Sequence, residues 1–130
     1  MTTDRPLLDG ITVLNLASVG PAVRAARWLA DWGADIIKVG PVPRDAGVQI
    51  TPPAYAYSAH RGMRRALLDL KSDGGRDAFL QLVAHADVVI ESFRPGVVDR
   101  LGIGYGALRA VNPRIVLCST TGFEIGRAHV

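Results

Sequence analysis

Cysteine, lysine and long apolar runs are all scarce in this sequence of 130 residues. The single cysteine, Cys118, excludes an internal disulfide framework and a zinc site built from cysteines. No apolar run approaches the roughly 20 residues that a helix needs to cross a bilayer. The first ten residues carry acids and a proline where a signal peptide has an apolar stretch. We therefore expect a soluble, cytoplasmic protein with no membrane partner.

The net charge is small, at +3, from 15 Lys and Arg residues against 12 Asp and Glu residues. Nearly all the cations are arginines, whose forked side chains pair with phosphate or carboxylate but also cover ordinary surfaces. Nucleic-acid-binding proteins usually interleave their basic residues with aromatic ones. The densest basic cluster here has no aromatic residue, and it consists of Arg61, Arg64, Arg65 and Lys71. We therefore expect no nucleic acid partner.

Short apolar runs alternate with helical patterns, and 48% hydrophobic residues are enough for one core. The pattern predicts strands at residues 11–16, 34–39, 65–70, 87–91 and 115–119. It predicts helices from Pro21 to a stop at Gly33, from Pro95 to Arg100, and from Tyr105 to Val111. It also predicts a helix capped by Ser72 or Asp73, whose inner face is Ala78, Phe79, Leu82 and Val83. This order predicts an α/β fold with a mostly parallel sheet and helices on its faces. Residues 40–59 hold four prolines, and we expect a long ordered loop there, of a kind that is often functional.

Local motifs exclude the common nucleotide sites. The turn after the first predicted strand has one glycine, Gly20, where the dinucleotide fingerprint requires three. The second predicted strand ends in Lys38-Val39-Gly40, with no acid to hold a ribose. No P-loop motif is present either.

Metal sites and activated nucleophiles are equally hard to find. His60 and His85 have no partner at ligand spacing, so we expect no metal. Cys118 lies in an apolar run, which predicts a buried and inert thiol. Ser18 lacks the flanking glycines of a nucleophile elbow, and we interpret it as a helix cap. Local chemistry therefore offers a scaffold with cations suited to phosphate, and no catalytic residue.

Residues 91–96 are placed where a predicted strand leads into a predicted helix. Open parallel sheets bind ligands at this end of their strands, and helix N-termini favour anions. An ordinary connection capped by Ser92 accounts for the same residues equally well. The cations at 61–71 either serve the same ligand or lie along a solvated strand edge, and spacing alone does not decide.

Two stretches resemble class III CoA-transferases, the CaiB/BaiF family, which includes α-methylacyl-CoA racemases. The first, residues 6–39, reads PLLDGITVLNLASVGPAVRAARWLADWGADIIKV and is similar to the opening of the family. The second, residues 64–123, resembles the next block in order, and its most specific strings are ESFRPGVVDRLG, NPRIV and TGF.

The resemblance implies a Rossmann-like N-terminal half that binds coenzyme A, in a full-length enzyme that forms interlocked dimers. Its motifs LDLK, ESF and VVDR imply six residues that contact CoA, the first two near the adenosine and phosphates: Leu68, Lys71, Ser92, Phe93, Val97 and Arg100.

The sequence departs from the family pattern at three places. Gly40 stands where an acid often follows I-K-V, and Pro41 replaces a cation that is common shortly after it. Residues 62–65, Gly-Met-Arg-Arg, replace the frequent N-K-R-S. One CoA contact is therefore in question, and the acyl-CoA substrate cannot be named.

The resemblance also implies a catalytic aspartate beyond Phe123, which attacks the acyl-CoA thioester and carries first the acyl group and then CoA. In racemases, a histidine and an aspartate in the same region exchange the α-proton. We therefore expect residues 1–123 to be a truncated CoA-transferase domain, inactive by itself, that would use acyl-CoA and a carboxylic acid. A racemase fragment and a non-catalytic CoA-binding remnant are the alternatives.

Residues 124–130, EIGRAHV, depart from the glycine-rich continuation of the family. They correspond to a translated sequencing adapter, and we interpret them as a non-native tail.

Overall fold

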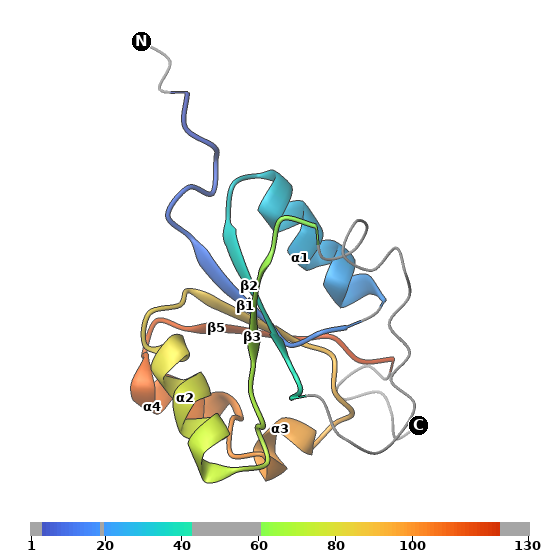
Figure 1. The fold of residues 1–130 in the computed structure, drawn as a ribbon, viewed down its shortest axis with the longest axis vertical. Helices are drawn as coiled ribbons and strands as arrows, with labels where there is room; N and C mark the ends of the chain where they lie inside the picture. The colour runs from blue at the N-terminus through green and yellow to red at the C-terminus, as the bar shows by residue number, and fades with distance from the viewer. Residues whose placement is uncertain (1–3, 19, 43–60, 123–130) are drawn as a thin grey trace.

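The computed structural model describes residues 4–18, 20–42 and 61–122. In this part of the chain, five short strands form one sheet in the order β3-β2-β1-β4-β5, with every neighbouring pair parallel (Figure 1). The strands are β1 (Thr12–Asn15), β2 (Asp35–Gly40), β3 (Arg64–Leu67), β4 (Val88–Glu91) and β5 (Val116–Ser119). The predicted α/β fold with a parallel sheet is confirmed.

The helices begin and end at residues that the sequence marks. Helix α1 (Pro21–Asp31) has proline in its first turn, and Gly33, at φ 100°, follows its end. Helix α2 (Asp73–Val83) is capped by Ser72, whose Oγ accepts a hydrogen bond from the Gly75 N–H at 3.0 Å. The remaining helices are α3 (Val97–Arg100) and α4 (Tyr105–Val111).

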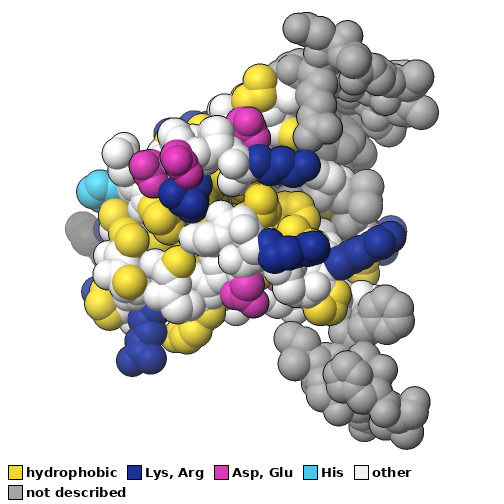
Figure 2. All heavy atoms as spheres, turned by 90° about the horizontal axis from the view of Figure 1, so that it is seen from below, with side chains coloured by type: hydrophobic (Ala, Val, Ile, Leu, Met, Phe, Trp, Pro, Cys, Tyr) yellow, Lys and Arg dark blue, Asp and Glu magenta, His cyan; other side chains and the backbone are white. Residues whose placement is uncertain are grey.

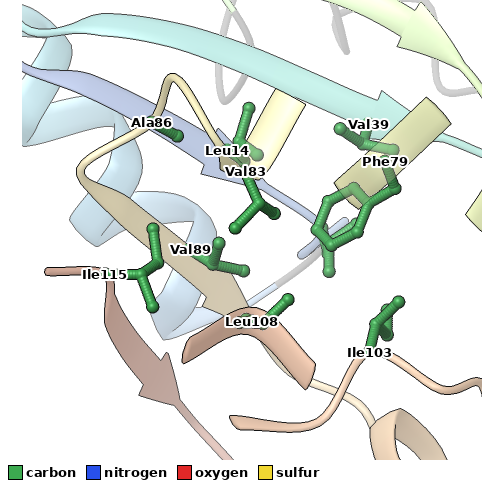
Figure 3. Packing of buried hydrophobic residues seen from close by; sticks show 10 residues of the cluster. Leu14, Val39, Phe79, Val83, Ala86, Val89, Ile103, Leu108 and Ile115 are labelled. Carbon is green, nitrogen blue, oxygen red and sulfur yellow. The ribbon is translucent and has the colours of Figure 1, made fainter. Parts of the chain in front are cut away.

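Helices cover both faces of the sheet, so the core has two parts (Figure 1). On one face, α1 buries Ala22, Val23 and Ala26 against strand residues such as Val13 and Ile36. On the other face, α2 and α4 pack over the sheet. Figure 3 shows this second cluster, in which side chains from α2 and α4 meet those of the strands: Leu14, Phe79, Val83, Val89 and Leu108. Each fully buried side chain of this size contributes roughly 1.5–3 kcal/mol.

Two predicted elements have a boundary that differs by two or more residues in the structure, while the other strands differ by a single residue at one or both ends. The strand predicted at 65–70 ends at Leu67, because the chain then turns through Asp69 into the cap of α2. The helix predicted from Pro95 begins at Val97, because Gly96 adopts a left-handed conformation at φ 85°. Of the loop predicted at 40–59, Gly40 belongs to β2, and residues 43–60 lie outside the described residues, as do residues 124–130.

The prediction for Cys118 is wrong, because its thiol is exposed. Strand β5 is at the edge of the described sheet, beside β4 alone, and of its four residues only Leu117 is even half-buried. An apolar run therefore does not make a buried strand when the strand lies at a sheet edge.

None of the helices in the described ranges is long and apolar enough to cross a membrane.

Candidate functional site

A pocket of about 530 Å³ lies at the carboxyl ends of three neighbouring strands. It is lined by residues at or after the ends of β1, β2 and β3, together with Phe93 after β4 and Leu101 after α3. The connections from β1 and β4 run to opposite sides of the sheet, and open α/β sheets bind ligands at such a switch point. Most of the lining side chains are apolar, and the polar ones are Ser18, Asp69 and Lys71.

The structure brings together three of the six predicted CoA-binding residues in this pocket: Leu68, Lys71 and Phe93. The other three, Ser92, Val97 and Arg100, do not line it. Ser92 and Arg100 are exposed, and Val97 is half-buried at the start of α3.

The segment that holds Lys71 is shaped by backbone and side-chain hydrogen bonds. The Leu68 N–H donates to the Gly40 carbonyl at 2.9 Å and so ties the end of β3 to β2. The Asp69 carboxylate accepts from the Lys71 N–H at 3.1 Å, and the Ser72 hydroxyl donates to the Asp69 carbonyl at 2.8 Å. The turn is thereby fixed between the strand and the capped start of α2, and Lys71 lies at the pocket.

Phe93 is held in the pocket by a buried acid that the sequence analysis did not single out. Glu91 is only 3% exposed, and its carboxylate accepts a hydrogen bond from the Phe93 N–H at 2.8 Å. The Glu91 carbonyl accepts from the Thr120 N–H at 2.9 Å, which joins this turn to the chain after β5. A charged residue at the end of an otherwise apolar strand was the signal for this role.

The structure decides how the connection at 91–96 reaches α3. The N-cap of α3 is Gly96, and no side chain caps this helix, so Ser92 is not its cap. The first amide of α3, on Val97, donates to the Arg94 carbonyl at 3.1 Å. With a single turn of helix and that amide already bonded, the start of α3 is a weak anion site.

Lys38 is the second functional candidate that the sequence analysis missed. It is 3% exposed, and its Nζ donates to Ser18 Oγ at 3.3 Å and to the Val39 carbonyl at 3.2 Å. Burial, and then the positive charge of Arg65, lower the pKa of Lys38 from 10.5 to about 8. The signal in the sequence was a lysine between apolar strand residues, in Ile37-Lys38-Val39.

Ser18 is therefore the acceptor of a buried cation rather than a helix cap. The N-cap of α1 is Gly20, and no side chain accepts a capping hydrogen bond there. Ser18 is exposed and lines the pocket, so Lys38 lies one hydrogen bond behind the pocket wall.

The basic cluster at 61–71 separates into different roles. Arg64 pairs with Asp35 across β3 and β2, Arg65 lies close enough to Lys38 to affect its pKa, and Lys71 lines the pocket. Figure 2 views the molecule from the side toward which β2 and β3 run in Figure 1, and it shows Lys and Arg side chains bordering apolar surface. A solvated strand edge therefore describes Arg64, while ligand binding by Lys71 stays a prediction.

A resident metal site is not visible in the described ranges, where no group of three or more His, Cys, Asp or Glu side chains could hold an ion.

Comparison with known proteins gives a consistent result. A family model described as CoA-transferase family III matches residues 8–128. The chain is 37% identical over 136 residues to the succinate–glutarate CoA-transferase of Agrobacterium fabrum, covering 95% of this chain and 34% of that protein. It is 38% identical over 121 residues to the acetyl-CoA:oxalate CoA-transferase of Acetobacter aceti, covering 88% of this chain and 31% of that protein.

The fold is similar to that of a solved protein of the same family. A solved CAIB/BAIF family protein from Brucella suis matches with a TM-score of 0.82 at 37% identity, over 92% of this chain and 34% of that chain. The chain thus spans about a third of the length of the proteins that it matches.

Proposed function

The chain belongs to CoA-transferase family III, and from this we propose that it is the CoA-binding part of an enzyme that moves CoA between an acyl-CoA and a carboxylic acid. The observation that supports the proposal is the pocket at the carboxyl ends of β1, β2 and β3, which Lys71 and Phe93 both line. Its volume of about 530 Å³ suits part of a ligand of this size.

The pocket offers the two kinds of contact that CoA requires. Its apolar lining, which includes Leu68 and Phe93, can cover the adenine ring or the pantetheine arm. The Lys71 ammonium supplies charge for a phosphate. We assign Ser92, Val97 and Arg100 to parts of CoA that extend beyond the pocket.

We place the covalent chemistry outside this chain. In the proposed reaction, an aspartate beyond Phe123 attacks the thioester carbonyl, which forms an acyl-aspartyl anhydride and releases the CoA thiolate. The thiolate then attacks the aspartyl carbonyl, so the donor carboxylate leaves and the aspartate carries CoA as a thioester. The acceptor carboxylate takes CoA by the reverse of these two steps, which restores the aspartate. The role of the described residues is to bind and orient CoA. We expect the 130 residues to bind CoA without turning over acyl-CoA, and the whole enzyme to be a dimer.

The similarity to the proteins of Agrobacterium fabrum and Acetobacter aceti favours a transferase over a racemase, since both of those proteins are named as CoA-transferases. A histidine paired with the aspartate in the remainder of the enzyme would indicate the racemase instead.

The test is calorimetric titration of the chain with CoA. We expect Lys71→Met to weaken CoA binding about tenfold, because a charge-assisted contact to phosphate is lost. The matched control is Arg109→Ala, which removes an exposed cation on α4 away from the pocket and is expected to leave the affinity unchanged. Absence of CoA binding, or equal losses in the two variants, would contradict the proposal.

A further inference from the structure

Lys38 is a buried cation without an acidic partner in the described part of the chain. Its Nζ has two acceptors, the Ser18 hydroxyl and the Val39 carbonyl, and both are neutral. None of the ion pairs among the described residues involves Lys38. A buried charge is costly unless a charge of opposite sign compensates for it, so this position favours an anion close by.

The hydrogen bond between Lys38 and Ser18 connects this charge to the pocket. Because Ser18 Oγ accepts a hydrogen bond from the Lys38 ammonium, the hydroxyl hydrogen of Ser18 is left to donate elsewhere. Ser18 is exposed and lines the pocket, so a ligand oxygen in the pocket is within its reach.

The polar side chains of the pocket lie at its two opposite ends. Ser18 follows β1, whereas Asp69 and Lys71 follow β3, and β2 lies between these strands. Two strand spacings separate the ends by about 10 Å. The site can therefore hold two charged groups of one ligand, or of two ligands, with apolar surface between them.

Among the residues that the structure describes, none supplies a negative charge that pairs with Lys38. Arg65 faces it from β3 and adds a second positive charge. From β1 its neighbour in register is the neutral Asn15, and the buried residues of α1 on this face are Ala22, Val23 and Ala26. These described neighbours of Lys38 therefore add positive charge or none beside Ser18.

We propose that the Ser18 hydroxyl, with the Lys38 ammonium behind it, is an oxyanion-binding site that holds a negatively charged oxygen of the bound ligand. The oxygen comes from a phosphate of CoA or from the carboxylate of the acyl group or acceptor acid. Only the identity of the ligand rests on the proposed function. Neither residue is among those that the family motifs imply.

The test uses the fact that the sequence has only two lysines, Lys38 and Lys71. In a chain labelled with ¹³C at lysine Cε, two signals are followed against pH with and without CoA, succinate or inorganic pyrophosphate. Lys38→Met assigns the signals. We expect a bound oxyanion to raise the pKa of Lys38 by about one pH unit, because a nearby negative charge favours the protonated amine. Ser18→Ala is expected to reduce that rise, while Ser119→Ala, an exposed serine on β5, leaves it unchanged.

The three probes distinguish a phosphate from a carboxylate as the bound oxyanion, and they distinguish the oxyanion site from the proposal that the chain binds CoA. A Lys38 response to CoA and pyrophosphate indicates a phosphate, and a response to succinate indicates a carboxylate; either supports the inference. If CoA moves the Lys71 signal but no probe changes the Lys38 titration, the inference is overturned and CoA binding stands. If succinate alone acts on Lys38, the inference stands without CoA binding. If no probe moves either signal, both proposals fail.

Discussion

At the scale of single residues, the charged ammonium of Lys38 lies at a buried position that lowers the stability of the folded chain. Its ammonium lies beneath the carboxyl edge of the sheet, where burial and the charge of Arg65 both disfavour the protonated form. A residue that is unfavourable for folding and lies beside a pocket is a candidate for ligand binding, since active sites are where such pKa shifts gather.

This cost predicts a pH dependence of stability. The pKa of Lys38 is about 8 in the folded chain and 10.5 when unfolded, so between these values the unfolded chain binds the extra proton. The free energy of unfolding should therefore rise with pH across this window, by up to about 1.4 kcal/mol per pH unit. Urea unfolding at pH 7 to 10 measures it, with Lys38→Met as the reference in which the other titrating groups cancel. Parallel curves for the two proteins would show that Lys38 does not titrate in this range.

Residue contacts that are local in sequence were predictable, and distant ones were not. Ser72 lies three residues from the amide that it caps, and Gly33 directly follows the helix that it ends, so both could be predicted from position. Ser18 and Lys38 are 20 residues apart and meet only because β1 and β2 pair in register, Asn15 beside Lys38. The sequence pattern contains no information on that register.

At the scale of elements, the start of α2 links helix stability to the pocket. Two glycines follow each other in its first turn and differ sharply in their surroundings. A Cβ on Gly74 would meet nothing within 4 Å, whereas a Cβ on Gly75 would lie 1.9 Å from the Asp69 carbonyl oxygen. Asp69 and Lys71 line the pocket, so a side chain that displaces the Asp69 backbone would also displace residues of the pocket.

The pair Gly74→Ala and Gly75→Ala tests this link. Gly74→Ala should stabilise the chain by up to about 1 kcal/mol, because alanine favours helix over glycine. Gly75→Ala should destabilise it by about 1–3 kcal/mol, because the methyl group overlaps backbone atoms. Thermal unfolding and CoA titration of both variants check this, with weaker CoA binding expected only for Gly75→Ala. Equal effects of the two substitutions would mean that the turn is not packed as described.

The order of strands and helices followed from periodicity, while two boundaries did not. Buried positions are occupied by apolar residues, so the spacing of apolar residues along the sequence indicates which segments are strands and which are helices. The end of β3 depends on the turn at Asp69, and the start of α3 depends on the left-handed Gly96, which are backbone choices that side-chain patterns record poorly.

At the scale of the whole molecule, strand order creates the site. The order β3-β2-β1-β4-β5 brings together residues from the ends of β1, β2 and β3 and from the turn after β4. Strands in sequence order would separate β1 from β4. A parallel sheet was predictable from the repeated crossovers, but its strand order, the pocket and the exposure of Cys118 on the edge strand follow from tertiary packing.

The most direct test of the account is a map of CoA binding by ¹H–¹⁵N NMR on the 130-residue chain. Amide signals are recorded with and without saturating CoA. We predict the largest shifts in residues 16–18, 68–71 and 93, at the carboxyl edge of the sheet, and little change in α4. No shifts at saturating CoA, or shifts centred on α4 and β5, would contradict the claim that this pocket binds CoA.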